Sequence, residues 1–169
     1  LTVPVVADRG MARTLEDGRF DFVFNIAEGE GRRCREAIPA AVCELLGLRY
    51  TGSAPPTLAA TLDKSIARRI VSPDVPVANT AGPRYPVIVK PNDGGSTIGL
   101  TKVTKSNELK TAFELALMES KVVLVEDYIK GRELTVPVLD GQALPVIEII
   151  PKSGLYDYEA KYTKGKSEY

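Results

Sequence analysis

Histidine is absent from the 169 residues of the sequence, and cysteine occurs only twice. Without histidine, Ser-His-Asp and Cys-His catalysis and histidine-ligated metal sites are excluded within these residues. Cys34 and Cys43 are too few for a disulfide framework or a zinc site, so we expect two reduced thiols. Any chemistry here must therefore use lysines, carboxylates, hydroxyls, backbone dipoles and a borrowed metal ion.

The sequence also lacks an excess of charge and a long apolar run. Lysine and arginine number 22, as do aspartate and glutamate, and this balance gives no sign of a nucleic-acid or membrane surface. No apolar run approaches the ~20 residues that a membrane-spanning helix needs. The first residues, LTVPVVADRGM, lack the regions of a signal peptide. We therefore predict a cytoplasmic protein without nucleic-acid or membrane partners.

The first third of the chain has the pattern of an α/β unit. Asp21–Ile26 (DFVFNI) predicts a buried strand, and Glu36–Gly47 predicts a helix with Pro39 in its first turn and its final glycine as the stop. A strand, a helix and then RYTGS favour a parallel arrangement. Residues 56–70 predict one further helix, because aliphatic side chains recur every four residues, at Leu58, Leu62, Ile66 and Ile70.

The organisation changes near Ser72, where a proline-rich stretch to residue 86 predicts irregular structure. Two strands then flank a glycine-rich loop. Ser106 is the expected N-cap of a helix whose buried face would hold Leu109, Ala112, Phe113, Ala116 and Leu117. A buried strand ending in a carboxylate follows, and then a hairpin that turns at Asp140-Gly141. This second part is therefore predicted to be an α+β body.

The glycine-rich loop KPNDGGSTIG spans residues 90–99 and fits neither GxGxxG nor the P-loop pattern. Gly94 and Gly95 permit positive φ, so that successive N–H groups can converge on an anion. Ser96 and Thr97 add hydroxyl donors, and Lys90 comes at the end of an apolar strand where a hydrophobic residue would be expected. Phosphate binding and a plain turn are about equally favoured by these residues alone.

Two more segments carry polar groups of interest. Glu126 closes a buried strand, and the following Tyr128 and Ile129 could form a wall for a purine; the alternative is a solvated turn. Glu133 could bind a ribose hydroxyl or pair with Arg132 or Lys130. YDYEAKY, residues 156–162, is typical either of a mobile lid that brings a lysine onto a phosphate or of an amphipathic surface loop.

Several motifs follow one another in a fixed order: FDFVFNIAEG, LLGLRYTGS, LDKS, YPVIVKPNDGGSTIG, VLVEDYIKGRELTV and LYDYEAKY. In this order they resemble the ATP-grasp enzymes and, among these, the D-alanine–D-alanine ligases. The resemblance covers nearly the whole chain from Asp21 onward. It implies an α/β and α+β fold in three parts: a partial N-terminal α/β domain (1–71), the central ATP-grasp subdomain (72–130) and the beginning of the C-terminal subdomain with its lid loop (131–169).

The resemblance also implies a role for each matching residue. Lys64 and Lys90 match the lysines that hold the α- and β-phosphates of ATP. The rest of the nucleotide-binding set comprises the glycine loop, the contacts to adenine and the contact to ribose: Gly94, Gly95, Ser96, Thr97, Glu126, Tyr128, Ile129 and Glu133. Ser96, Lys161 and Tyr162 match the catalytic residues of the loop and of the lid that caps the site during phosphoryl transfer.

The sequence departs from the family at three points. The family's first strand and glycine-rich turn, with a glutamate that touches the first substrate, have no counterpart before Asp21. Ile26–Arg33 has no histidine, although the family carries His-Gly and Gly-Glu-Asp-Gly in this segment of the first amino-acid site. No residues match the acid and asparagine ligands of Mg²⁺, so we expect a truncated chain whose magnesium ligands lie beyond Tyr169. The identity of the amino-acid substrate is therefore open.

The resulting prediction is an ATP-dependent carboxylate–amine ligase that works through an acylphosphate. The resemblance implies D-alanine–D-alanine ligase or a close relative, acting in peptidoglycan precursor synthesis on ATP and D-alanine. Two alternatives are a non-catalytic nucleotide-binding homologue and a ligase for a different amino acid or small acid. A homodimer is implied by the resemblance alone.

Overall fold

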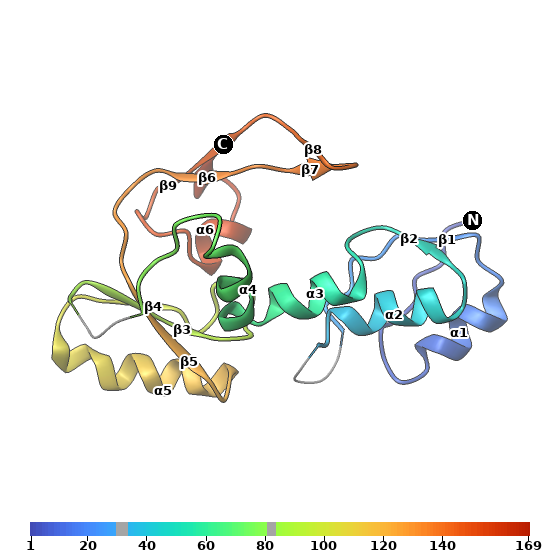
Figure 1. Ribbon diagram of the computed structural model, residues 1–169, viewed down its shortest axis with the longest axis horizontal. Helices are drawn as coiled ribbons and strands as arrows, with labels where there is room; N and C mark the ends of the chain where they lie inside the picture. Colours follow the sequence, from blue (N-terminus) through green and yellow to red (C-terminus); the bar gives the residue numbers. More distant parts are fainter. Residues whose placement is uncertain (30–33, 81–83) are drawn as a thin grey trace. The chain divides into compact units, whose positions relative to one another are not determined.

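The computed structural model describes residues 1–29, 34–80 and 84–169. The chain divides into two compact units, Leu1–Val75 and Pro76–Tyr169, and Figure 1 shows the elements of each. Within the described ranges no helix is long and apolar enough to cross a membrane. Cys34 and Cys43 are both free thiols, as expected. A further boundary between residues 130 and 131 stays a prediction.

The first unit contains the predicted parallel α/β element. β1 (Phe22–Val23) and β2 (Arg49–Tyr50) pair in parallel, and α2 (Ala37–Leu45) lies between them in sequence. Pro39 is in the first turn of α2, where its missing N–H has no helical partner to lose. Gly47 follows the helix with φ +67°, a left-handed conformation that glycine adopts without strain. The predicted helix, its proline and its stop are confirmed.

The first unit also contains a helix that the sequence analysis did not identify, α1 (Met11–Gly18). Met11 and Leu15 are one turn apart, both are buried, and they form a small core with Cys43 of α2. In the sequence, the four-residue spacing of these two apolar side chains is the feature that indicates the helix. One pair within eight residues is too short a pattern to predict a helix without its neighbours.

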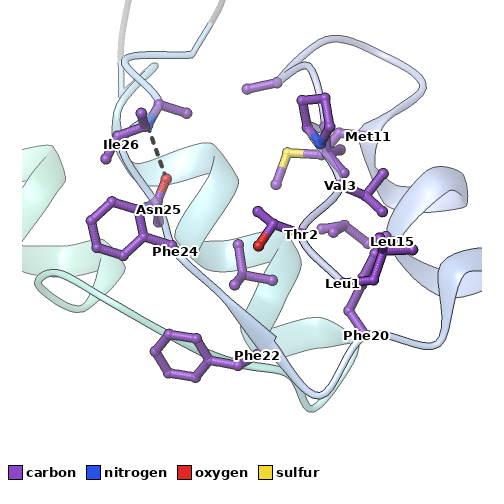
Figure 2. A pocket seen from close by; sticks show the side chains of 15 residues that line it. Leu1, Thr2, Val3, Met11, Leu15, Phe20, Phe22, Phe24, Asn25 and Ile26 are labelled. Atoms are coloured by element: carbon purple, nitrogen blue, oxygen red, sulfur yellow. Dashed lines mark hydrogen bonds between the residues drawn. The ribbon is translucent and has the colours of Figure 1, made fainter.

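The strand predicted over Asp21–Ile26 is present, but it is shorter than expected, and its burial was predicted wrongly. β1 has only two residues, and Phe22, Phe24 and Ile26 are 51%, 73% and 81% exposed. Because side chains alternate along an extended chain, these three lie on the same side. A cavity of about 540 Å³, lined mainly by apolar side chains of residues 1–27, adjoins this segment (Figure 2). A parallel sheet needs cover on both faces, and here the helices supply it on one.

The structure breaks the helix predicted over Pro56–Ile70 into two. α3 (Pro55–Leu62) and α4 (Lys64–Val71) are separated at Asp63, whose ψ of 103° is not helical. The Asp63 carboxylate accepts a hydrogen bond from the backbone N–H of Ile66 at 3.0 Å. An aspartate that caps a new helix competes with continuation of the old one, which explains the break. Leu62 is buried, whereas Ile66 and Ile70 are 42% and 58% exposed, so only part of the predicted apolar face is buried.

The second unit begins with an antiparallel sheet in the order β4 (Thr101–Val103), β3 (Val87–Pro91) and β5 (Val123–Asp127). The helix α5 (Leu109–Glu119) runs along one face of this sheet (Figure 1). The sheet and the helix share a buried core of Val87, Val89, Val103, Ala112 and Ala116. The two strands that flank the glycine-rich loop are confirmed. β5 is half-buried, not fully buried as predicted, except at its glutamate.

The opposite face of this sheet is polar. Val87 and Val89 are buried towards α5, so Ile88 and Lys90, which alternate with them, lie on the other side. Ile88 pairs directly with Lys102 of β4 and with Glu126 of β5, and directly paired residues share a face. We call this the polar face and define it by Ile88, Lys90, Lys102, Leu124 and Glu126.

The start of α5 differs from the prediction. Ser106 does not cap the helix but begins a 3₁₀ turn, η1 (Ser106–Glu108). The Glu108 carboxylate instead accepts a hydrogen bond from the backbone N–H of Thr104 at 2.8 Å and another from the next N–H along the chain. Glu108 thus reaches back to N–H groups before the turn, whereas a capping serine would accept from N–H groups that follow it. Leu117, predicted to be buried, is 53% exposed.

A second antiparallel sheet has the order β10 (Ser167–Glu168), β9 (Ile147–Pro151) and β6 (Glu133–Thr135). Between β6 and β9 the chain forms the predicted hairpin of β7 (Val138–Leu139) and β8 (Gln142–Ala143). Its turn residues, Asp140 and Gly141, have φ of 49° and 75°, as a two-residue turn of the Asp-Gly type requires. The predicted hairpin is confirmed.

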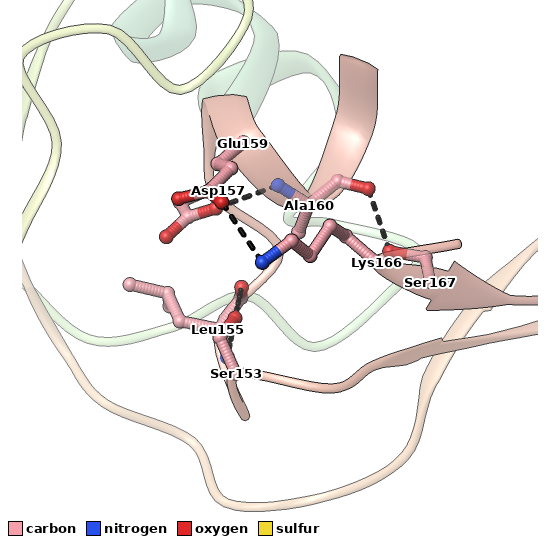
Figure 3. Close-up of polar contacts among 7 residues, drawn as sticks. All are labelled: Ser153, Leu155, Asp157, Glu159, Ala160, Lys166 and Ser167. Atoms are coloured by element: carbon pink, nitrogen blue, oxygen red, sulfur yellow. Dashed lines mark hydrogen bonds and ion pairs between the residues drawn. The ribbon is translucent and has the colours of Figure 1, made fainter. Parts of the chain in front are cut away.

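The segment YDYEAKY, predicted as a loop, contains the short helix α6 (Tyr158–Tyr162). The Asp157 carboxylate accepts a hydrogen bond from the N–H of Ala160 at 2.8 Å and caps the helix. The Ser167 hydroxyl donates to the Ala160 carbonyl at 2.7 Å, as Figure 3 shows. The helix is therefore tied to β10, which explains why these residues are ordered as a turn of helix.

Candidate functional site

The polar face of the first sheet carries an ion pair. Lys90 Nζ lies 2.5 Å from Glu126 Oε2, and the two side chains are 20% and 10% exposed. Ile88 is the direct cross-strand partner of Glu126, so the pair runs diagonally from β3 to β5. The sequence predicted that a lysine at this strand end would meet an anion. The structure provides one from within the protein and holds the ammonium beside the glycine-rich loop.

The residues after β5 lie at the other end of the polar face. The backbone N–H of Tyr128 donates to the Pro86 carbonyl at 3.1 Å, so this N–H is already occupied and is not open to the edge of a base. The ammonium of Lys102 lies 3.6 Å from the centroid of the Tyr128 ring. Ile129 is 68% exposed and offers an apolar surface. The sequence analysis missed Lys102, whose signal is its place on the strand that follows the loop.

The glycine-rich loop takes left-handed conformations at unexpected positions. Positive φ falls on Ser96 (50°) and Thr97 (64°), not on Gly94 or Gly95 as predicted. A β-branched residue in this region is strained, which costs on the order of 1–3 kcal/mol. Gly99 has φ +70°, and a Cβ there would lie 2.9 Å from Cγ of Pro91. The glycine that the backbone needs is therefore the last of the loop.

Two hydrogen bonds join this loop to the YDYEAKY segment. The hydroxyl oxygens of Ser96 and Tyr162 are 2.7 Å apart, and the Thr97 hydroxyl donates to the backbone carbonyl of Tyr156 at 3.1 Å. Ser96 and Tyr162 are 66 residues apart in the sequence. The structure therefore brings together Ser96 and Tyr162, two of the three residues predicted to be catalytic.

The third of these residues, Lys161, lies near a tyrosine ring in a segment that contains several tyrosines. Its ammonium lies 5.2 Å from the centroid of the Tyr156 ring. The hydroxyls of Tyr156 and Tyr169 are 3.1 Å apart, and this hydrogen bond raises the pKa of Tyr156 above its ordinary value. The rings of Tyr158 and Tyr162 are 4.8 Å apart between centroids.

Glu133 is exposed on β6, and the described residues include no ion pair that it forms. The neighbouring Arg132 instead makes a two-pronged ion pair with Glu148 of β9, at 2.8 Å from Nε and 2.6 Å from Nη2. The alternative in which Glu133 pairs with Arg132 is therefore wrong, and its carboxylate stays available. Its role as a ribose ligand stays a prediction.

Lys64 is the first residue of α4 in the first unit, directly after the capping Asp63, and is half-buried. A cation at a helix N-terminus gains nothing from the helix dipole, whereas an anion bound there is stabilised by the dipole and by the lysine. At this end of α4 the Asp63 carboxylate already takes that place, since it accepts from the Ile66 N–H at 3.0 Å. The assignment of Lys64 to the nucleotide stays a prediction.

A metal site is not formed within residues 1–29, 34–80 and 84–169, where no group of three or more His, Cys, Asp or Glu side chains could hold an ion. The histidine-free segment noted in the sequence extends through residues 30–33, which lie outside the described residues. The second unit thus brings lysines, a carboxylate and hydroxyls together around a glycine-rich loop, which suits the binding of a phosphorylated ligand.

Comparison with known proteins identifies relatives for both units. The family model described as D-ala D-ala ligase C-terminus matches residues 68–169. A curated relative, the D-alanine–D-alanine ligase of Aquifex aeolicus, is 41% identical over 152 residues, covering 82% of this chain and 52% of the relative. The chain therefore spans about half the length of the relatives it matches.

Solved structures of ligases resemble the same region. The VanG D-Ala:D-Ser ligase from Enterococcus faecalis is 30% identical with a TM-score of 0.68, over 88% of this chain and 48% of that one. D-alanine–D-alanine ligase from Bacillus anthracis is 25% identical with a TM-score of 0.71, over 98% and 58% of the two chains. That ligase has also been solved in complex with ATP, at 24% identity and a TM-score of 0.63 over 81% and 51% of the chains.

Proposed function

Since this chain belongs to the D-alanine–D-alanine ligase family and has its ATP-grasp fold, we propose that it forms part of an ATP-dependent carboxylate–amine ligase. The observation that carries the proposal is the junction of the glycine-rich loop with α6. Ser96 and Tyr162 meet there at 2.7 Å, beside the strand that bears Lys90. A loop of N–H and hydroxyl donors, closed by a second segment, can hold a triphosphate and exclude water.

The proposed reaction divides amide formation into two steps. A carboxylate oxygen first attacks the γ-phosphorus of ATP, the bond to the β-phosphate oxygen breaks, and ADP and an acylphosphate result. An amine then attacks the acyl carbon, phosphate leaves with the electron pair of the broken C–O bond, and the amine releases a proton. Both steps depend on positioning and charge neutralisation, for which lysines, N–H groups and hydroxyls suffice without histidine.

The residues of this chain have separate parts in that scheme. Lys90 neutralises phosphate charge, while Ser96 and Thr97 hold the loop over the terminal phosphates. Glu126 and the backbone after β5 face the adenine, and Glu133 accepts a hydrogen bond from the ribose. Lys161, carried on α6, reaches the transferring phosphoryl group when the lid is closed.

Magnesium supplies further charge neutralisation to a bound triphosphate in reactions of this kind. No ligand group for it is found in the described part of the chain, so the proposal assigns its ligands to other residues of the complete protein. A cytoplasmic location, a homodimer and a role in peptidoglycan precursor synthesis belong to the same proposal.

D-alanine is the proposed substrate because the Aquifex relative and the Bacillus structure are both named D-alanine–D-alanine ligase. The Enterococcus structure, a D-Ala:D-Ser ligase, supports testing D-serine as the second amino acid. Release of ADP and phosphate by the complete protein should be measured with D-alanine alone, with D-alanine plus D-serine, and with other amino acids. No ADP with any acid–amine pair would refute the ligase proposal, and turnover only with other acids would refute D-alanine.

The lysines provide a second test. Lys90→Ala should weaken ATP binding more than Lys161→Ala, which should mainly slow phosphoryl transfer, because Lys90 is fixed on a strand and Lys161 lies on the lid. Equilibrium binding of ADP and single-turnover formation of ADP separate the two effects. Equal small effects on both steps would contradict the assignment.

A further inference from the structure

Lys102 stands on the polar face without a predicted role. It is half-buried on β4 and shares a cross-strand rung with Ile88 and Glu126. Residues on one rung point to one side of the sheet, so its side chain leaves the sheet on the same side as Lys90. The two lysines are two residues apart along the rungs, which is about 7 Å.

The partners of the two ammonium groups differ. Lys90 is held by the Glu126 carboxylate at 2.5 Å. Among the described residues, the recorded partner of the Lys102 ammonium is the Tyr128 ring, 3.6 Å from its centroid. An aromatic face attracts the charge but accepts none of the three N–H bonds in the way that an oxygen does. Lys102 can therefore donate to an incoming anion without breaking an ion pair.

The position of Lys102 along the sheet indicates which phosphate of a bound nucleotide would lie near its ammonium. One end of the polar face is marked by Tyr128, whose N–H bonds the Pro86 carbonyl just before β3. The other end is marked by Lys90 and the glycine-rich loop, four residues or about 13 Å farther along β3. Lys102 lies at the rung between them. A nucleotide with its base at the first end and its terminal phosphates at the loop would place its α-phosphate near this rung.

We propose that Lys102 is a nucleotide-binding residue that donates to the α-phosphate, and that the Tyr128 ring holds its ammonium in place when no ligand is bound. This inference rests on the proposed function, because it uses the direction of the nucleotide along the sheet. It adds a third lysine to the two that the family resemblance implied, and it gives the Tyr128 ring a role that its occupied N–H does not have.

The test uses the complete protein and three probes: adenosine, AMP and ADP. Lys102→Met keeps the aliphatic stem over the Tyr128 ring and removes the charge. Since a charge-assisted hydrogen bond is lost, the affinity for AMP and ADP should fall about 10- to 100-fold while that for adenosine is unchanged. Lys102→Arg, which retains the charge, should restore most of the loss.

A matched control is Lys110→Met on α5, which lies against the other face of the sheet. The Lys110 side chain is 87% exposed and pairs only loosely with Glu114, at 3.9 Å. Isothermal titration calorimetry on the four proteins decides the matter. An equal loss for adenosine, AMP and ADP would show that Lys102 acts through Tyr128 or the fold and would overturn the proposal. No loss beyond that of Lys110→Met would overturn it as well.

The same titrations separate this inference from the function on which it rests. If the wild-type protein fails to bind ADP, the nucleotide-binding function is refuted and the role of Lys102 is refuted with it. If the wild-type protein binds ADP and Lys102→Met binds it equally well, the nucleotide-binding part of the proposed function stands and only the inference about Lys102 is refuted.

Discussion

Removing the carboxylate of Glu126 should destabilise the protein far more than breaking an ion pair at the exposed surface. Glu126→Gln keeps the size and shape of the side chain but leaves the Lys90 ammonium without its charged partner. The two side chains are only 10% and 20% exposed, so water can solvate the remaining charge only in part. We therefore expect a loss well above that of an exposed pair.

The magnitude follows from the burial. Breaking a fully buried ion pair by removing one partner costs about 3–5 kcal/mol, because the other charge remains uncompensated. With partial exposure of Lys90, the glutamine carbonyl still able to accept one hydrogen bond, and some relaxation, we expect about 2–3 kcal/mol. For a urea m-value of roughly 2 kcal/mol per molar, this moves the unfolding midpoint down by about 1 M.

The control is Glu148→Gln, which breaks the ion pair with Arg132 on the second sheet. Its geometry is better, with two contacts of 2.8 and 2.6 Å, but the Arg132 side chain is 73% exposed. Solvent screening should therefore make this loss much smaller than that of Glu126→Gln. Urea unfolding of both variants followed by circular dichroism is the assay. Equal midpoint shifts, or a larger shift for Glu148→Gln, would refute the argument that burial sets the magnitude.

Four further changes test other contacts. Tyr162→Phe removes the 2.7 Å bond to Ser96, worth about 0.5–1.5 kcal/mol net, and should speed amide hydrogen exchange of α6 and the loop together; unchanged exchange would contradict the junction. Thr97→Gly relieves the strain of a positive φ but removes the hydroxyl that bonds the Tyr156 carbonyl. It should therefore speed amide exchange of α6 without lowering the urea midpoint. Thr97→Ser keeps the hydroxyl and should leave amide exchange of α6 as in the wild type. Asp63→Ala should cost about 1 kcal/mol in urea unfolding and Asp63→Asn much less, since only the alanine loses the cap of α4. Hydrogen bonds from the backbone and side chain of Thr104 lower the pKa of Glu108. The contribution of this carboxylate to stability is therefore full at neutral pH and is lost as the pH falls through the lowered pKa. Thermal unfolding between pH 7 and 3 should show a weaker pH dependence for Glu108→Gln than for the wild type.

Much of the fold was predictable because its signals are local. The Asp140-Gly141 turn, the stop at Gly47 and the strand at Val87–Pro91 depend on residues within a few positions of each other. The break at Asp63 was not predicted, because the same letters allow a continuous helix or a capped new one. The choice is made by a side-chain bond to Ile66 that a periodic pattern does not reveal.

The site shows the same division. Lys90, the loop and YDYEAKY are recognisable as motifs, but the contacts that join them are between residues far apart in sequence. Glu126 was expected to face a ligand, and its bond to Lys90 depends on the register of β3 against β5. Lys102 was overlooked for the same reason, since only the rung with Ile88 shows which way its side chain leaves the sheet.

In the proposed ligase, the ion pair of Lys90 and Glu126 would also bear on how long a nucleotide stays bound. A phosphate that reaches Lys90 competes with a carboxylate already 2.5 Å away, so the protein carries its own counter-ion. Part of the attraction for the incoming ligand is offset by loosening that contact, and the contact re-forms as the product departs. In the proposed reaction, such an exchange would lower the barrier to release of ADP and favour rapid turnover over tight retention of the product.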